Sequence, residues 1–301
     1  MTHATAPVLN ALTIDVEDYY HVSAHEGAIG FENWDRYDSR VEPNTHRLLA
    51  ILEARHIKAT FFVLGWVGER HPALVQAIHQ CGHEIASHGY SHRRIYSQTP
   101  SDFREETRRA KRHLEDTIGE AVIGYRAASY SITSKSFWAL DILREEGFLY
   151  DSSIFPIHHD TYGIPEYPRF CHRTNGARSG GLIEFPLSTL RVAGVNIPIA
   201  GGGYFRLLPY PLTRWGIRRI NSRDSHPVVF YLHPWEIDPQ QPRIASSALS
   251  RFRHYVNLHK TEGRLIRLLE DFRFAPMRTV LTHQGLLGDP QRCAASPASC
   301  A

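Results

Sequence analysis

The sequence predicts an α/β fold with parallel strands, and two observations support this prediction. Short apolar, β-like runs alternate with amphipathic stretches from the N-terminus onward, which is typical of parallel α/β proteins. The chain has 301 residues, of which 42% are hydrophobic and 22% are charged. A chain of this size and composition can bury one large core or two small ones.

Each element follows from its local pattern. Seven segments have the composition of buried strands: 9–16, 58–65, 84–88, 121–127, 148–154, 181–187 and 227–234. Four amphipathic stretches between them predict helices: 41–57, 71–82, 101–119 and 134–147. The third of these opens with Ser101 and carries acidic residues early and basic residues later, as helix capping and the helix dipole favour.

The pattern loosens after the fifth strand. Residues 156–181 are rich in Pro, Gly and aromatic residues, and we expect an ordered excursion over the mouth of the fold. Residues 197–221 combine a glycine turn with a helix, and residues 246–272 form a helical segment that we expect to break at Gly263.

Charge and apolar patterning exclude several classes of partner. The net charge is +3, and the basic run at 103–116 alternates with acidic residues, which predicts a solvated helix face with i,i+4 pairs rather than a nucleic-acid surface. No apolar run is long enough to span a bilayer, and no basic leader with an apolar stretch opens the sequence. We therefore expect a cytoplasmic protein without an integral membrane segment.

Polar side chains gather where the predicted strands end, which is where parallel α/β barrels place their reactive groups. Those side chains are Asp15, Glu17, Asp18, His88, His92, Arg126, Asp151 and His233. Two imidazoles at i and i+4 with one carboxylate make a three-ligand metal site with open positions for water and substrate. The chain has 19 histidines, so a loop whose histidines face solvent remains the alternative interpretation of "HGYSH".

Five motifs in order, "TIDVED", "HGYSH", "GYRAASYS", "YDSS" and "YLHP", resemble those of the NodB-type polysaccharide deacetylases, which are carbohydrate esterases of the family 4 type. The resemblance implies a distorted (β/α)7 barrel of the NodB-homology type. It implies Asp15 as general base held by Arg126, His88 and His92 as metal ligands, and His233 as general acid oriented by Asp151.

The first motif departs from the family pattern, because Val16 follows Asp15 where a second aspartate is usual. The metal carboxylate is then Glu17 or Asp18, and strand alternation, which puts Glu17 on the face of Asp15, favours Glu17. Gly89 replaces a hydroxyl residue in the second motif, and Ala128 stands where the third motif commonly has proline.

The resemblance also suggests substrate contacts and a cofactor. We expect a backbone N–H near Ser129 or Tyr130 to stabilise the oxyanion, and Trp235 to stack on a sugar ring. The divalent metal is expected to be Zn2+, with Co2+ or Ni2+ as alternatives, since imidazole and carboxylate suit all three.

Segments outside the five motifs resemble the branch of these deacetylases that is associated with exosortase and PEP-CTERM systems. They are "YGIPEYPRFCHR", the stretch 182–221 and "LHPWEIDPQQPR". We expect a single deacetylase domain at 1–283, with an inserted extension around 155–226 and a C-terminal helical segment at 244–275, followed by a disordered tail at 284–301.

The function implied by the resemblance is metal-dependent removal of N-acetyl groups from an amino sugar in bacterial exopolysaccharide biosynthesis. The substrate would be an oligo- or polysaccharide or its lipid-linked precursor, and the enzyme could lie at the inner membrane surface. Two alternatives stay open: a deformylase or allantoinase-like amide hydrolase that uses the same site, and a carbohydrate-binding protein that has lost catalysis.

Overall fold

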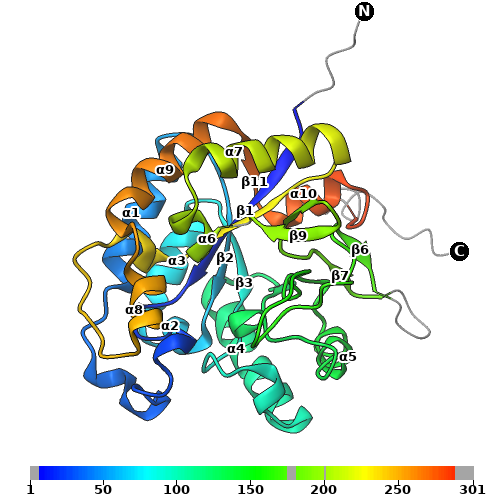
Figure 1. Ribbon diagram of the computed structural model, residues 1–301. Coiled ribbons are helices and arrows are strands. Elements are labelled where there is room, and N and C mark those ends of the chain that lie inside the picture. The colour runs from blue at the N-terminus through cyan, green and yellow to red at the C-terminus, as the bar shows by residue number, and fades with distance from the viewer. Residues whose placement is uncertain (1–6, 175–180, 200, 289–301) are drawn as a thin grey trace, which may run out of the picture.

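Seven parallel strands, one within each of the seven predicted segments, form the centre of the protein (Figure 1). The structure is a computed structural model that describes residues 7–174, 181–199 and 201–288. In sheet order the strands are β10 (Val229–Leu232), β1 (Leu9–Val16), β2 (Thr60–Val63), β3 (Glu84–Ser87), β4 (Gly124–Tyr125), β5 (Tyr150–Asp151) and β7 (Ile183–Glu184). Within the described residues β7 does not pair with β10. The sheet therefore curls into an incomplete barrel, which confirms the predicted distorted (β/α)7 class.

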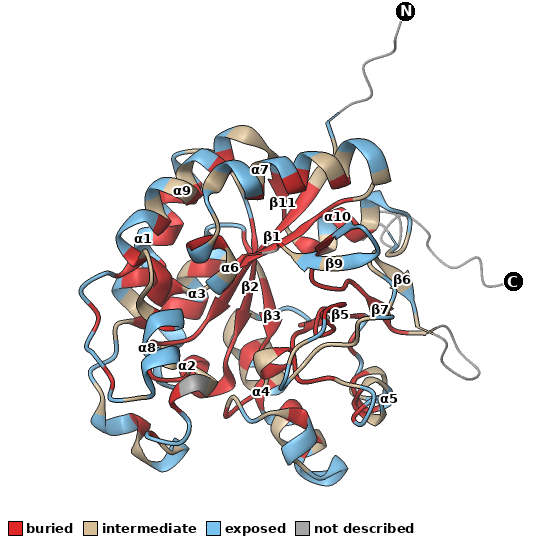
Figure 2. Cartoon of the chain, viewed as in Figure 1, coloured by how far each residue is buried: buried red, intermediate tan, exposed pale blue. Residues whose placement is uncertain are grey.

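Helices cover the outside of the sheet, and Figure 2 shows their buried faces turned toward the strands and their exposed faces toward solvent. They are α1 (Val41–Glu53), α2 (Gly65–Arg70), α3 (Pro72–Gln80), α4 (Pro100–Ile118), α5 (Trp138–Glu145), α6 (Gly202–Leu207), α7 (Tyr210–Arg219), α8 (Ala248–Tyr255), α9 (Leu258–Asp271) and α10 (Met277–His283). No helix among the described residues is long and apolar enough to cross a bilayer.

Strand alternation divides the core into two clusters. On β2, Phe61 packs into the cluster beneath the helices, whereas its neighbour Phe62 belongs to the cluster inside the barrel. On β1, Leu12 and Ile14 likewise belong to the outer cluster. The side chain of Asp15 therefore has the parity of the barrel interior, which is where a catalytic carboxylate is needed.

Two helix boundaries differ from the sequence predictions. Helix α4 begins at Pro100 and not after a Ser101 cap, because the Thr99 hydroxyl accepts the Asp102 backbone N–H at 3.2 Å and proline suits the first helical position. The C-terminal helical segment breaks before Gly263, at Asn257, whose φ of 54° is left-handed and separates α8 from α9. Gly263 lies inside α9.

Several basic residues of α4 are paired with acidic residues, although mostly not along the helix as expected. Lys111 and Glu115 form the expected i,i+4 pair at 3.5 Å. Arg108 instead binds Glu146 just beyond α5 at 2.7 Å, and Arg109 binds Glu69 of α2. These side chains therefore tie α4 to its neighbours.

Four short strands were not expected from the sequence. Strand β6 (His172–Arg173) is antiparallel to β7, β11 (Arg273–Ala275) is parallel to the start of β1, and β8 (Thr189–Val192) and β9 (Val195–Pro198) form a separate hairpin. The hairpin turn, Ala193–Gly194, has positive φ at both residues, which Ala rarely adopts and which the sequence does not signal.

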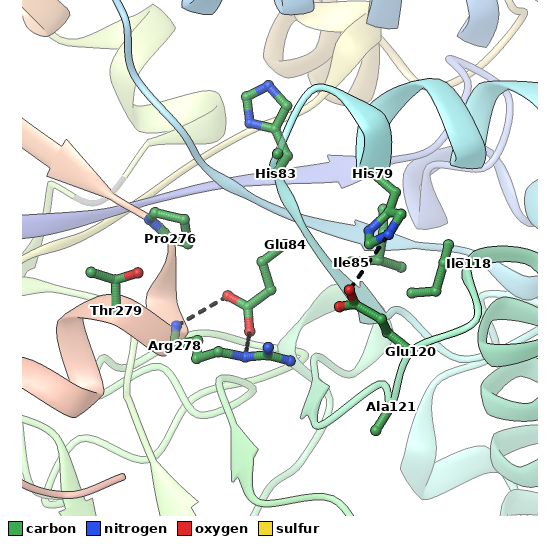
Figure 3. A pocket seen from close by; sticks show the side chains of 11 residues that line it. His79, His83, Glu84, Ile85, Ile118, Glu120, Ala121, Pro276, Arg278 and Thr279 are labelled. Carbon is green, nitrogen blue, oxygen red and sulfur yellow. Dashed lines mark hydrogen bonds and ion pairs between the residues drawn. The ribbon is translucent and has the colours of Figure 1, made fainter. Parts of the chain in front are cut away.

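The opposite, N-terminal end of the barrel also has a hollow, lined in part by His79, Glu84, Glu120 and Arg278 (Figure 3). The Glu84 carboxylate accepts hydrogen bonds from the Tyr150 hydroxyl at 2.9 Å and from the Arg278 backbone N–H at 3.0 Å. Glu84 is therefore fully engaged in holding β3 to its neighbours, and the N-terminal end has a stabilising role, as is usual in such barrels.

The domain boundaries remain predictions. Residues 289–301, most of the expected tail, lie outside the described residues. Before them, Leu286 and Leu287 still pack against the inner core cluster.

Candidate active site

Asp15 and Arg126 form a buried ion pair at the end of β1. The Arg126 guanidinium donates from Nη1 to Asp15 Oδ1 at 2.6 Å and to the Thr13 hydroxyl at 2.8 Å. Its other nitrogens donate to the Ser152 backbone carbonyl and hydroxyl, and its plane lies 4.1 Å from the Phe62 ring centroid. The arginine is thus held on every side, and Asp15 Oδ2 is the oxygen left free to act on a substrate.

Glu17, His88 and His92 form a group that could hold a metal ion. One ligand atom from each lies within 4.8 Å of the others. His92 Nε2 lies 3.0 Å from Glu17 Oε2, and the two histidine rings are 5.3 Å apart. The i,i+4 spacing brings the imidazoles together through a tight turn in which Gly89 and His92 have positive φ, and not on a helix.

The protonation of this group suits metal binding. Burial lowers the pKa of His88 to about 4, and its Nδ1 pairs with the Arg126 backbone carbonyl at 2.8 Å, which leaves Nε2 as the free, neutral donor atom. Burial alone would raise the pKa of Glu17, but the imidazoles of His92 and His233 outweigh it and hold that pKa well below its usual range.

Glu17, and not Asp18, belongs to this group. The Asp18 carboxylate accepts hydrogen bonds from Ser39 Oγ at 2.8 Å and from the backbone N–H groups of Tyr19, Arg40 and Val41. These four bonds occupy its oxygens at the start of α1. Of the two alternatives, the structure favours Glu17 as the ligand.

His233 completes the site from the end of β10. Its Nε2 lies 3.0 Å from Glu17 Oε1 and 3.9 Å from Asp15 Oδ2, and its Nδ1 lies 2.7 Å from Glu236 Oε1. Arg206 in turn donates to Glu236 at 2.6 Å. Burial alone would lower the pKa of His233, but Glu17, Glu236 and Asp15 outweigh it and raise the pKa to about 9.

The partner that orients His233 is Glu236, so the expected orienting role of Asp151 is wrong. Four strands, β1 to β4, separate Asp151 on β5 from β10 in the sheet. Asp151 instead accepts from the Ser153 hydroxyl at 2.5 Å and lies in register with Glu184 of β7. The H-P-x-E spacing was the signal in the sequence for Glu236. The proline after His233 starts a short 3-10 turn, and this turn brings the side chain of Glu236 back to His233, the N-cap residue.

The backbone N–H groups of Ser129 and Tyr130, which were expected to stabilise the oxyanion, differ in whether they are already hydrogen-bonded. Ser129 and Tyr130 have left-handed φ values of 51° and 53°. The Tyr130 N–H is already bonded to the Ala127 carbonyl, whereas no hydrogen bond from the Ser129 N–H is found in the described part of the chain. Ser129 is therefore the better oxyanion donor of the two.

Trp235 is not an exposed platform for a sugar. Its side chain is buried, and its ring stacks on His233 at 5.2 Å and on His254 at 4.3 Å. The expectation of sugar stacking does not fit this placement, and Trp235 packs behind the histidine instead.

Comparisons with known proteins show what the chain resembles. Residues 31–148 match the family model described as polysaccharide deacetylase, and residues 152–282 match a domain of unknown function, DUF3473. A peptidoglycan deacetylase of Helicobacter pylori is 29% identical over 114 residues, which are 38% of this chain and 37% of that protein. A chitooligosaccharide deacetylase of Bradyrhizobium is 28% identical over 99 residues, which are 33% of this chain and 43% of that protein. The chain thus matches about two fifths of the length of these relatives.

Solved structures show the same fold. A proposed polysaccharide deacetylase from Mycobacterium smegmatis superposes with a TM-score of 0.60 at 20% identity, over 100% of this chain and 96% of that one. Puue allantoinase superposes with a TM-score of 0.58 at 15% identity, over 93% of this chain and 91% of that one. Residues 31–148 are thus similar to the NodB-type polysaccharide deacetylases, and the solved structures show that the whole chain has the same fold as members of that group.

Proposed function

We propose that this protein is a metal-dependent N-deacetylase that acts on an amino sugar of a polysaccharide or its lipid-linked precursor. The observation that supports it is the convergence of a three-ligand group, Glu17, His88 and His92, with Asp15 and His233 at the same strand ends. The site combines metal ligands with a carboxylate and an imidazole, which is the equipment needed to hydrolyse an amide.

The donor set fits a divalent metal, with Zn2+ first and Co2+ or Ni2+ as alternatives. The buried Glu17 Oε2 atom lies 3.0 Å from His92 Nε2, and His88 offers a neutral nitrogen, so one carboxylate and two imidazoles face one another. A bound ion would supply Lewis acidity toward the acetyl carbonyl and would make water more acidic. Three protein ligands leave positions for water and substrate, as catalytic sites require.

The residues of the chain divide the proton transfers between them. Asp15, oriented by Arg126, takes a proton from the attacking water through Oδ2. The Ser129 N–H stabilises the charge that develops on the carbonyl oxygen. His233 gives its proton to the nitrogen of the sugar as the C–N bond breaks, so that acetate and a free amine leave.

The substrate class follows from relatives and resemblance. The relatives named above act on peptidoglycan and chitooligosaccharide, both built from N-acetylated amino sugars. The resemblance to the exosortase-associated branch places the proposed reaction in bacterial exopolysaccharide biosynthesis, and a cytoplasmic setting at the inner membrane is part of this proposal.

Metal content per chain tests the site. We expect near-stoichiometric divalent metal in the wild type by elemental analysis after reconstitution with zinc. The variants His88→Ala and Glu17→Ala should lose it, whereas Asp18→Ala should keep it in any chain that remains folded. Wild-type protein that holds no zinc, cobalt or nickel would contradict the metal site.

Acetate release tests the reaction. We expect release from N-acetylglucosamine oligomers and none from allantoin or a formylated amine. Activity on either of the latter would instead support the amide-hydrolase alternative. Sugar binding without acetate release in a metal-loaded protein would favour a carbohydrate-binding protein.

A further inference from the structure

The segment that follows the His233 turn has a one-sided charge. Residues 239–260 contain no Asp or Glu, and they carry Arg243, Arg251, Arg253 and Lys260, all exposed. Residues 185–223 also lack Asp and Glu, but several of their arginines, such as Arg206 and Arg214, are paired with acidic residues, whereas the four cations of 239–260 are all exposed. No ion pair involves these four cations within the described residues.

Helix α8, inside this segment, exposes two large apolar side chains. Leu249 is 58% exposed and Phe252, one turn later, is 56% exposed. Single exposed apolar residues are ordinary on protein surfaces. Here, however, two share one helix face at i,i+3 and alternate with Arg251 and Arg253. We call Arg243, Leu249, Arg251, Phe252 and Arg253 the α8 surface.

The other side of α8 is committed to the protein, so the exposed residues do not await burial in this fold. His254 is buried, stacks on Trp235 and pairs through Nε2 with Gln241 at 2.7 Å. Arg206, which holds Glu236, also donates to the Arg253 carbonyl at 3.0 Å. Through these contacts α8 is fixed beside the catalytic histidine, at the edge of the barrel (Figure 1).

We propose that the α8 surface docks on an anionic membrane, which brings the mouth of the active site to the bilayer. The charge is complementary to acidic lipid headgroups, and each arginine near such a surface strengthens binding about fivefold. Leu249 and Phe252 would enter the boundary between headgroups and acyl chains. A hydrated acidic polymer could use the arginines, but it would give the two apolar side chains no apolar environment.

Vesicle sedimentation tests the proposal with the full chain. Vesicles of phosphatidylcholine with and without 30% phosphatidylglycerol are the probe. We expect binding to the anionic vesicles only. Arg251→Gln with Arg253→Gln should weaken it about 25-fold, as two arginines at about fivefold each imply. Leu249→Ser with Phe252→Ser should weaken it at least tenfold.

Matched controls remove similar groups elsewhere. Leu149→Ser removes a 48% exposed apolar side chain, and Arg112→Gln with Lys135→Gln removes two exposed cations from other elements. Both should bind like the wild type, and near-UV circular dichroism should show all variants folded.

Three results would overturn the proposal. The first is that the wild type sediments with neither kind of vesicle. The second is that the control variants lose as much binding as the α8 variants. The third is that the arginine variant loses binding while the Leu249 and Phe252 variant binds fully. The last would show a site for polyanions. The assay needs no substrate, so its outcome is independent of the proposed deacetylation.

Discussion

His233 lies between carboxylates that serve it in different ways. Its Nε2 faces Glu17 and Asp15, where substrate would bind, and its Nδ1 faces Glu236, which Arg206 holds from behind. The hydrogen bond made by one ring nitrogen of a histidine determines whether the other ring nitrogen is the proton donor or the acceptor. Glu236 is therefore a positioning residue.

Replacement of Glu236 by glutamine should lower kcat roughly 10- to 100-fold with little change in KM, because residues behind a reacting histidine act on its orientation and basicity. Asp151→Asn is the matched control and should change kcat only a few-fold, because Asp151 lies across the sheet. The pH profile of kcat should shift in Glu236→Gln only. Equal losses in both variants would return the orienting role to Asp151.

Asp15→Asn should lower kcat by about two to four orders of magnitude, as loss of a general base does. The amide still accepts a hydrogen bond from Arg126, so the fold should remain intact by circular dichroism. Full activity in a folded Asp15→Asn protein would refute the base assignment.

At the scale of elements, two glycines show how packing decides the effect of one methyl group. A Cβ on Gly65, at the start of α2, would lie 2.8 Å from the Ala110 Cβ of α4 and 2.7 Å from Tyr90. A Cβ on Gly263, within α9, would meet nothing within 4 Å. The close approach of α2 to α4 therefore requires glycine at position 65, whereas the packing of α9 does not require glycine at position 263.

Gly65→Ala should destabilise the protein by about 1–3 kcal/mol, because the two helices must move apart. Gly263→Ala should stabilise it by roughly 0.5–1 kcal/mol, because alanine suits a helix interior better than glycine. Urea unfolding of both variants measures the two changes. Destabilisation by Gly263→Ala would mean that α9 bends at this glycine, as the sequence suggested.

At the scale of the whole molecule, stability should depend on a buried carboxyl pair that joins β5 to β7. Asp151 and Glu184 lie in register, are both fully buried, and interact with each other through their carboxyl groups. Burial, and for Glu184 the charge of Asp151 as well, raises the pKa of both groups. The folded protein therefore binds protons more tightly than the unfolded chain, whose carboxyl groups titrate near pH 4.

It follows that the contribution of this pair to the stability of the folded protein decreases as the pH rises from about 4 through the raised pKa values of the folded state. Glu184→Gln removes one titrating group and offers a hydrogen-bond donor to Asp151. The stability of this variant relative to the wild type should therefore increase as the pH rises from 5 to 8. Thermal unfolding across this range measures it. Glu146→Gln is the contrasting control: Arg108 and Arg104 lower the pKa of Glu146, so its effect should stay constant over the same range.

The sequence by itself determined the seven parallel strands and the positions of Asp15, His88, His92, Arg126 and His233 at strand ends. Apolar periodicity and motif spacing are local properties, and in a parallel barrel every strand carries its reactive end to the same side. Those two facts suffice to place the residues in one site.

Only the tertiary structure decided which neighbours these residues have. Strand alternation favours Glu17 over Asp18 as the metal ligand, and the tertiary structure adds that residues at the start of α1 occupy Asp18 with hydrogen bonds. Asp151 has the motif position expected of a partner for His233, yet sheet order separates them and the turn after His233 supplies Glu236. Trp235 is buried because α8 returns to cover it. Hydrogen-bond partners and burial depend on contacts between distant segments, and periodicity along the chain does not encode them.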